Sequence, residues 1–281
     1  MDSPDPNIAN PPAPAPGRMV VELDHLTRRF GSFVAVDDVS FSVAAGETFG
    51  LIGSNGAGKS TILKMLATLL PPSGGRARIA GFDIAAQATE VRRHIGYVPQ
   101  LLSSDGALTA WENLLLSARL YDVPRQEVRS RIEHALAAMD LQGVAHKLVQ
   151  GFSGGMIRRL EIAQSMLHRP AVLFMDEPTV GLDPVARRAV LDHVSALRLQ
   201  FGTTIIVTSH YMEEIEELCG RLAVLSHGRL VALDTPAALK ARIGPNATLD
   251  DVFAALAGTG EGSAESYRDV RATRRAARSH G

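Results

Sequence analysis

A glycine-rich segment constrains the fold of this chain more than any other part of its sequence. The segment reads Gly-Ser-Asn-Gly-Ala-Gly-Lys-Ser-Thr from Gly53 to Thr61. It follows a short apolar run, Thr48–Ile52, and leads into Ser60–Leu70, whose apolar residues recur at helical spacing until two prolines follow. This order predicts a strand, a tight turn and a helix, with the turn at the carboxyl end of the strand.

The spacing of Gly, four residues and then Gly-Lys-Ser is typical of a phosphate-binding loop. Glycines let successive backbone N–H groups point at phosphate oxygens, and the following helix adds its positive N-terminus. Lys59 is predicted to neutralise the β- and γ-phosphates, and the Ser60 hydroxyl to ligate Mg²⁺. The residues predicted to contact the phosphates are Gly53, Ser54, Asn55, Gly56, Ala57, Gly58, Lys59, Ser60 and Thr61.

Two adjacent acids, Asp176 and Glu177, follow a second apolar run, Ala171–Met175. A parallel strand delivers such residues to the carboxyl edge of its sheet, where ligands bind. Asp176 is then predicted to hold Mg²⁺, directly or through water, and Glu177 to orient and polarise an attacking water. When the pair is considered alone, acids that cap a strand at the surface are the alternative interpretation.

A Ser-Gly-Gly turn at Ser153, Gly154 and Gly155 opens a third amphipathic stretch. Ser153 is a good N-cap, and the two glycines expose the first backbone donors of the predicted helix. The segment would therefore offer a second anion-binding helix terminus in the same chain. An ordinary capped helix is the simpler interpretation of this segment considered alone.

Strand and helix patterns alternate along most of the chain, which favours an α/β fold with a mainly parallel sheet. The region from about residue 101 to 168 changes to helical spacing and is predicted to be an inserted helical subdomain. The predicted strands are Val20–Leu26, Phe33–Val43, Thr48–Ile52, Ala171–Met175, Thr204–Thr208 and Leu222–Leu225. The predicted helices are Ser60–Leu70, Trp111–Tyr121, Gln126–Met139, Met156–His168, Pro184–Gln200 and Met212–Cys219.

Composition excludes several classes of protein. The formal net charge of −1 gives no global field that would recruit nucleic acid, so no nucleic-acid partner is expected. Cys219 is the only cysteine, which excludes an internal disulfide and a cysteine-based zinc cluster. No apolar run approaches the roughly 20 residues that span a bilayer. We therefore expect a soluble, cytoplasmic protein, and any membrane role must come through a partner.

The two ends of the chain differ from its centre. Residues 1–18 carry six of the fifteen prolines and predict a disordered leader. The domain is predicted to span 19–245, and residues 246–281 to form a carboxyl-terminal extension with an arginine-rich tail. Such a tail could attract anionic lipid or an acidic partner, although most runs of this kind are solvated.

The motifs occur in an order that resembles the ABC ATPase family over Met19–Ile243. That order is the phosphate loop, Gln100, Ser-Gly-Gly, Asp176-Glu177, Gly181-Leu182-Asp183 and His210. The resemblance implies a P-loop NTPase core with a mainly parallel sheet, an N-terminal antiparallel β subdomain and the inserted helical subdomain. It also implies hydrolysis of ATP with Mg²⁺ by a subunit that drives a separate transmembrane permease from the inner face of the membrane.

The same resemblance implies a head-to-tail homodimer that encloses two ATP molecules. In that dimer, Ser153 and Gly155 of one subunit contact the γ-phosphate held by Lys59 of the other. Gln100 contacts Mg²⁺ or the attacking water and links the site to the membrane partner, and Asp183 runs along the dimer seam.

The resemblance also assigns two residues at the edge of the site. His210 reaches the γ-phosphate, although a histidine in this position considered alone is more often an ordinary strand-end residue. Phe30 stacks on the adenine, but Phe33 lies close by, and either ring could instead pack in the core.

Three positions depart from the commonest form of the family. Phe152 and Met156 replace Leu and Gln beside the Ser-Gly-Gly turn, and Gly181 replaces Ala. The Met and Gly variants, together with the segment Thr248–Phe253, resemble the drug-exporter branch that includes daunorubicin-resistance ATPases. A non-transport ABC ATPase, a small-molecule P-loop kinase and an inactive nucleotide switch are the alternative functions.

Overall fold

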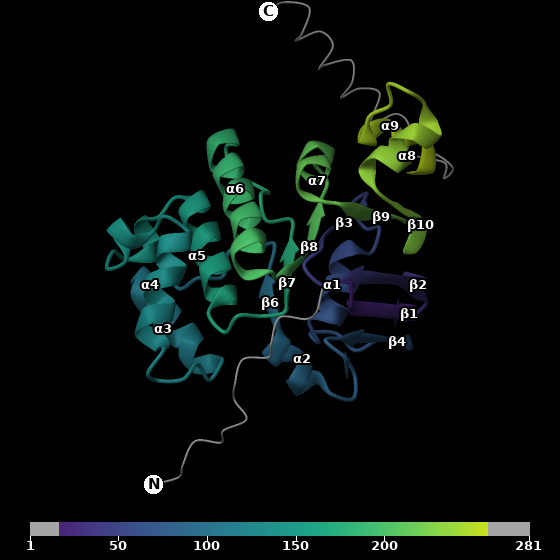
Figure 1. The fold of residues 1–281 in the computed structure, drawn as a ribbon. Coiled ribbons are helices and arrows are strands. Elements are labelled where there is room, and N and C mark those ends of the chain that lie inside the picture. Colours follow the sequence, from purple (N-terminus) through teal and green to yellow (C-terminus); the bar gives the residue numbers. More distant parts are fainter. Residues whose placement is uncertain (1–16, 258–281) are drawn as a thin grey trace, which may run out of the picture.

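A six-stranded sheet organises the computed structural model, which describes residues 17–257 (Figure 1). The strand order is β10-β9-β3-β8-β7-β6, and every neighbouring pair is parallel except β10 with β9. These strands are β3 (Thr48–Gly53), β6 (Ile95–Val98), β7 (Val172–Asp176), β8 (Thr204–Ser209), β9 (Arg221–Ser226) and β10 (Arg229–Asp234). The mainly parallel sheet predicted from the sequence is confirmed.

A second, four-stranded antiparallel sheet has the order β2-β1-β4-β5. Its strands are β1 (Met19–Phe30), β2 (Phe33–Ala44), β4 (Gly74–Ile79) and β5 (Phe82–Asp83). Helix α1 (Lys59–Leu66) packs with β1, β2 and one face of the six-stranded sheet in a single hydrophobic cluster. This arrangement fixes the glycine-rich turn between the two sheets.

Three helices between β6 and β7 form a separate layer, seen at the left of Figure 1. They are α3 (Ala110–Leu120), α4 (Val128–Ala138) and α5 (Gly154–Met166), with the short 3₁₀ helices η1 (Gln142–Val144) and η2 (Val149–Gly151). A capping box between Thr109 and Glu112 begins α3. The predicted helical insertion is confirmed, whereas the domain boundaries at residues 18 and 245 stay predictions.

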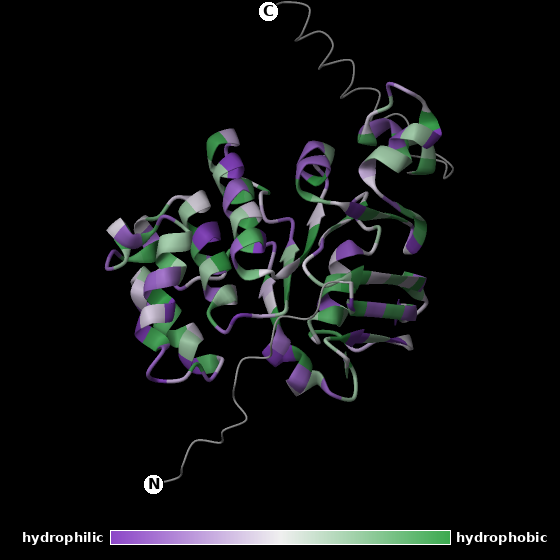
Figure 2. Cartoon of the chain, viewed as in Figure 1, coloured by the Kyte–Doolittle hydropathy of each residue, from purple (hydrophilic) through white to green (hydrophobic). Residues whose placement is uncertain are grey.

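The remaining helices cover the ends and faces of the larger sheet. They are α2 (Ala88–His94), α6 (Pro184–Phe201), α7 (Met212–Leu218), α8 (Pro236–Ile243) and α9 (Leu249–Ala257). Helices α6 and α7 carry both hydrophilic and hydrophobic residues (Figure 2), as expected of helices with one face on a core. Helix α9 packs against α7, α8 and β9.

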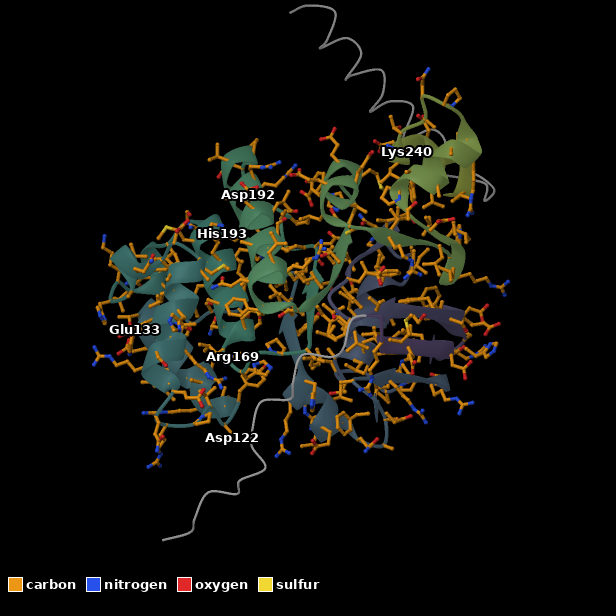
Figure 3. All side chains as sticks on the ribbon, in the orientation of Figure 1. Asp122, Glu133, Arg169, Asp192, His193 and Lys240 are labelled. Carbon is orange, nitrogen blue, oxygen red and sulfur yellow. The ribbon has the colours of Figure 1, made fainter. Side chains whose placement is uncertain are left out.

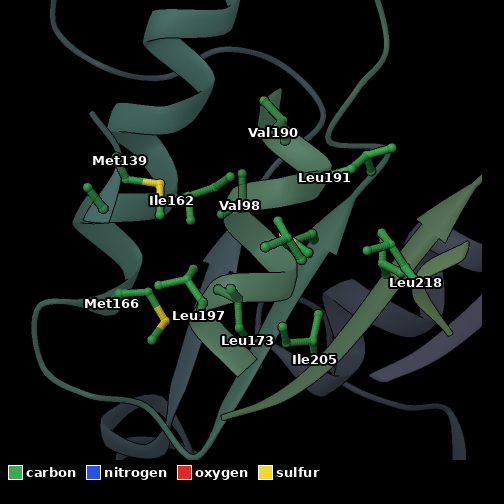
Figure 4. Packing of buried hydrophobic residues seen from close by; sticks show 14 of the residues in the cluster. Val98, Met139, Ile162, Met166, Leu173, Val190, Leu191, Leu197, Ile205 and Leu218 are labelled. Atoms are coloured by element: carbon green, nitrogen blue, oxygen red, sulfur yellow. The ribbon is translucent and has the colours of Figure 1, made fainter. Parts of the chain in front are cut away.

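Both faces of the six-stranded sheet are covered, which explains why its strands read as continuous apolar runs. In β7, Leu173 and Met175 face the cluster shared with α5 and α6, shown in Figure 4. Val172 and Phe174 face the opposite cluster, shared with α1. Charged side chains such as Glu133 and Asp192 lie at the periphery of the molecule (Figure 3).

Helix α1 ends at Leu66, so the predicted end at Leu70 was wrong. Thr68 has a φ of 59°, a left-handed conformation that breaks the helix before the prolines are reached. The carbonyl of Lys64 then accepts hydrogen bonds from the N–H groups of Leu69 and Leu70. Leu69 and Leu70 therefore continue the apolar spacing of a helix, although they lie beyond its last residue.

Within residues 17–257, no helix is long and apolar enough to cross a membrane. The predicted leader, except Gly17 and Arg18, and the arginine-rich tail lie outside the described residues.

Candidate functional site

The glycine-rich turn leaves β3 at Gly53 and enters α1 at Lys59. Gly56 and Gly58 have φ values of 81° and 100°, in the region that glycine adopts without a steric penalty. The N-cap of α1 is Gly58, which has no side chain to accept a hydrogen bond from the first helical N–H groups. The turn therefore presents backbone donors and a positive helix end to an anion.

Lys59 is buried beneath this turn. Its ammonium donates hydrogen bonds to the carbonyl oxygens of Gly53 at 2.9 Å and Ser54 at 3.2 Å. Nζ also lies 3.6 Å from Oε1 of Glu177. Burial lowers the pKa of Lys59, and the negative charge of Glu177 opposes that shift. The ammonium is thus fixed at the point where the turn would surround a phosphate.

Ser60 and Asp176 meet at the carboxyl edge of the sheet. The Ser60 hydroxyl donates to Oδ1 of Asp176 at 2.9 Å, and the Thr208 hydroxyl donates to the same oxygen at 2.8 Å. A hydroxyl and a carboxylate are hard oxygen donors, and Mg²⁺ is commonly bound by one or two such groups together with substrate phosphates. The residues predicted to hold Mg²⁺ at this edge therefore fit that ion.

Glu177 brings three other predicted site residues together. Besides the contact with Lys59, its Oε2 lies 3.2 Å from Nδ1 of His210 and accepts a hydrogen bond from Nε2 of Gln100 at 3.4 Å. Glu177 has a φ of 48°, a conformation that costs energy in a residue other than glycine. Asp176 and Glu177 are only 2% and 7% exposed. Surface strand-capping is therefore the wrong interpretation of this pair.

Ser153 and Asp183 lie elsewhere on the chain. Ser153 caps α5 by accepting a hydrogen bond from the N–H of Met156, and Asp183 caps α6 by accepting two from the backbone. Among the described residues, no hydrogen bond joins either side chain to Lys59 or Glu177. Within the described residues, the side chains of Ser153 and Asp183 therefore take no part in the hydrogen-bonded cluster around Lys59 and Glu177.

Gly154 and Gly155, the other residues of that turn, begin α5. A Cβ added to Gly155 would lie 2.7 Å from the Cβ of Ala186, and one added to Gly154 would lie 3.4 Å from a methyl of Leu182. The absence of a side chain at Gly155 thus lets the start of α5 pack closely on α6.

Phe30, which is predicted to stack on the adenine, and the nearby Phe33 are both exposed. Phe30 is 44% and Phe33 63% exposed, so packing in the core is the wrong interpretation for either ring. The guanidinium of Arg28 stacks on Phe30, 4.6 Å from the ring centroid. An exposed ring of this kind can accept a flat ligand on its surface.

Comparison with known proteins adds an independent line of support. A family model described as "ABC transporter" matches residues 36–180, just over half of the chain. The chain is 42% identical over 226 residues to the daunorubicin/doxorubicin resistance ATP-binding protein DrrA of Streptomyces peucetius, covering 80% of this chain and 68% of that protein. The chain belongs to the ABC transporter family.

Two further proteins show how far the likeness to other ABC proteins extends. The linearmycin resistance ATP-binding protein LnrL of Bacillus subtilis is 38% identical over 225 residues, covering 80% of this chain and 72% of that protein. A solved structure described as an ATP binding subunit of an ABC transporter matches with a TM-score of 0.76 and 30% identity, covering 84% of this chain and 99% of that one.

This ABC family member also holds a buried glutamate that its sequence does not reveal. Glu214, in the first turn of α7, accepts hydrogen bonds from the hydroxyls of Thr179 and Ser209. Those residues follow Glu177 and precede His210 along the chain, so Glu214 ties the two segments together. In the sequence, an acid in the first turn of a helix looks like an ordinary helix-terminal residue, and nothing marks it as buried.

Gly53 needs to lack a side chain in this ABC fold. A Cβ there would lie 2.7 Å from the carbonyl oxygen of Leu225 and 2.8 Å from the Cβ of Ala57. We expect Gly53→Ala to destabilise the protein by about 2 kcal/mol, as overpacking does in other cores. Urea unfolding measures the change. Gly143→Ala is the control, because a Cβ there meets no atom within 4 Å. Equal unfolding midpoints for the two variants would contradict this packing argument.

Proposed function

We propose that the chain is the ATP-binding and ATP-hydrolysing subunit of an ABC exporter that drives a separate transmembrane permease. The proposal rests on one observation. Lys59, Gln100 and His210 all contact the Glu177 carboxylate. This cluster lies where β7 and β8 end, beside the phosphate loop that follows β3. Family membership supports ATP as the nucleotide.

The reaction is ATP + H₂O → ADP + phosphate, and the chain acts mainly by position and charge. The loop amides and Lys59 neutralise the phosphate oxygens. Mg²⁺, held by Ser60, Asp176 and Gln100, would neutralise charge between the β- and γ-phosphates.

Glu177 acts as the general base that orients and polarises the attacking water. His210 holds that water in position against the γ-phosphate. Gln100 and His210 both contact the Glu177 carboxylate, through the same oxygen, Oε2.

A second copy of the chain completes the proposed site. Ser153 and Gly155 begin a helix whose capping side chain makes no hydrogen bond to Lys59 or Glu177 of its own chain, and this helix end would meet a γ-phosphate held by another subunit. The exposed position of Ser153 supports this head-to-tail arrangement. Asp183, which also caps a helix, would lie along the seam between the subunits.

The cargo proposed is drug-like, antibiotic or lipid-like. Two relatives are named for resistance to daunorubicin and doxorubicin or to linearmycin. Others are named as Nod factor export ATP-binding proteins and are 40–42% identical. On this proposal the subunit sits at the cytoplasmic face of the membrane, bound to its permease.

Phosphate release by the purified full-length chain with ATP and Mg²⁺ tests the proposed reaction. Hydrolysis that requires Mg²⁺ supports it, and ATP binding without any hydrolysis overturns it. Affinity purification from membranes tests the transport role. Recovery of a protein with several apolar spans of about 20 residues supports an exporter. Recovery of a soluble partner alone would favour the non-transport alternative.

Ser153 allows a sharper test of the dimer. Asp and Asn are as good as Ser at an N-cap, so Ser153→Asp and Ser153→Asn should both keep α5 intact. Only Asp sets a negative charge against the γ-phosphate of the other subunit. We expect turnover in Ser153→Asp to fall about thirtyfold below that of Ser153→Asn, from roughly 2 kcal/mol of repulsion. Equal turnover and equal ATP-dependent dimerisation in the two variants would contradict the head-to-tail dimer.

A further inference from the structure

One face of α5 is polar although it is buried. Arg158 and Glu161 are only 1% and 4% exposed, and Gln164 continues the same row one turn further. Residues three apart lie on one side of a helix, so these side chains point in a common direction. They face the segment that leaves β6 at Val98 and carries Gln100.

Arg158 holds the backbone of that segment. Its Nη1 donates to the carbonyl oxygen of Pro99 at 2.6 Å, and its Nη2 donates to the carbonyl oxygen of Gln100 at 2.7 Å. Nη1 also lies 2.9 Å from Oε2 of Glu161. One planar guanidinium thus joins two successive carbonyls of the segment to a carboxylate of α5.

Glu161 and Gln164 hold the next residues in order. Oε1 of Glu161 accepts hydrogen bonds from the N–H and the hydroxyl of Ser103. Oε1 of Gln164 accepts one from the hydroxyl of Ser104 at 2.8 Å. Three side chains spaced along α5 therefore hold residues 99–104 against that helix.

A buried ion pair contributes little to the net free energy of folding. Removing two charges from water costs several kcal/mol per ion, and apolar residues of similar volume often serve as well or better. Burial lowers the pKa of Arg158 and raises that of Glu161, as expected for groups withdrawn from solvent. The specific gain from this pair is the fixed position of the segment that it holds.

We infer that Arg158 and Glu161, here called the α5 anchor, are positioning residues that fix Gln100 to α5. Ser153 begins the same helix about 8 Å from Arg158, at 1.5 Å per residue. Movement of the Ser153 end against a γ-phosphate therefore moves Gln100 relative to Glu177. The catalytic part of this inference rests on the proposed hydrolysis.

The test replaces the α5 anchor with apolar residues of similar size, Arg158→Met with Glu161→Leu. It compares this double variant with Gln100→Ala and with the variant that combines all three changes, in the full-length chain. We expect the anchor variant and Gln100→Ala each to lower kcat about tenfold, the low end for residues that orient a metal site, with KM for ATP nearly unchanged. The combined variant should be no slower than Gln100→Ala, because both changes act through Gln100.

Arg131→Met is the matched control. Arg131 is also buried in the helical layer and donates to a backbone carbonyl, that of Leu167, but it does not touch segment 99–104. This variant should keep the wild-type kcat. If Arg131→Met lowers kcat as much as the anchor variant does, or if the effects of the anchor and Gln100→Ala multiply, the inference is overturned.

Amide hydrogen exchange tests the attachment without hydrolysis. In the nucleotide-free chain, the amides of residues 100–104 should exchange faster in the anchor variant than in the wild type, and at the wild-type rate in Arg131→Met. Unchanged exchange refutes the α5 anchor. A wild-type chain that binds ATP and never hydrolyses it would refute the proposed function, while exchange still decides whether the anchor exists.

Discussion

Replacing Glu177 by glutamine is expected to slow ATP hydrolysis about a thousandfold while ATP binding is retained. Glutamine keeps the size of the side chain and one of its two terminal oxygens, so the contacts with Gln100 and His210 stay within reach. It cannot draw a proton from water, and it removes the negative charge that lies 3.6 Å from the ammonium of Lys59. Because hydrolysis is what reopens the proposed dimer, the variant should accumulate as an ATP-bound pair.

Phosphate release and size-exclusion chromatography with ATP and Mg²⁺ measure both effects. Glu133→Gln is the matched control, because Glu133 is exposed on α4 and, within residues 17–257, forms an ion pair only with Arg129. That variant should hydrolyse ATP at the wild-type rate and should not accumulate as a dimer. Normal steady-state hydrolysis by Glu177→Gln would remove Glu177 from the proposed mechanism.

The parts of the site that the sequence revealed are those whose chemistry is local. The phosphate loop is contiguous, and its glycines and Lys59 act at fixed spacing along the chain. Asp176 and Glu177 end an apolar strand, so their position at the sheet edge follows from the parallel topology. Gln100 and His210 were found through motif order, and the structure brings both to Glu177.

The parts that the sequence did not reveal depend on tertiary packing. Arg158, Glu161 and Glu214 are charged residues in helices, and charged residues in helices are usually solvent-exposed. Each is buried here because a distant segment covers it: residues 99–104 over α5, and the Thr179 and Ser209 hydroxyls over α7. No local spacing encodes those contacts.

Several short elements of the fold were missed for a related reason. Strand β4 contains two glycines and two arginines, and only Ala77 and Ile79 of its side chains are buried. Strand β6 has four residues, fewer than a periodic pattern needs. Both strands are specified by their neighbours in the sheets, because β4 pairs with β1 and β6 pairs with β7.

Replacing Lys59 by methionine is expected to weaken ATP binding by about 4 kcal/mol, on the order of a thousandfold. Methionine fills nearly the same volume but removes the ammonium that the carbonyls of Gly53 and Ser54 hold under the loop. The triphosphate would then face the carboxylate of Asp176 with less positive charge between them. The loop amides remain, so the loss should appear in affinity for the phosphates.

Equilibrium binding of ATP with Mg²⁺, measured in the Glu177→Gln background, keeps turnover from complicating the comparison. Lys64→Met is the control, because Lys64 lies on the same helix and is exposed. It makes the same chemical change away from the loop and should bind ATP as the parent does. If Lys59→Met also binds as the parent does, the buried ammonium does not contact the phosphates. The glycine-rich turn would then be a structural turn whose resemblance to a phosphate loop carries no function.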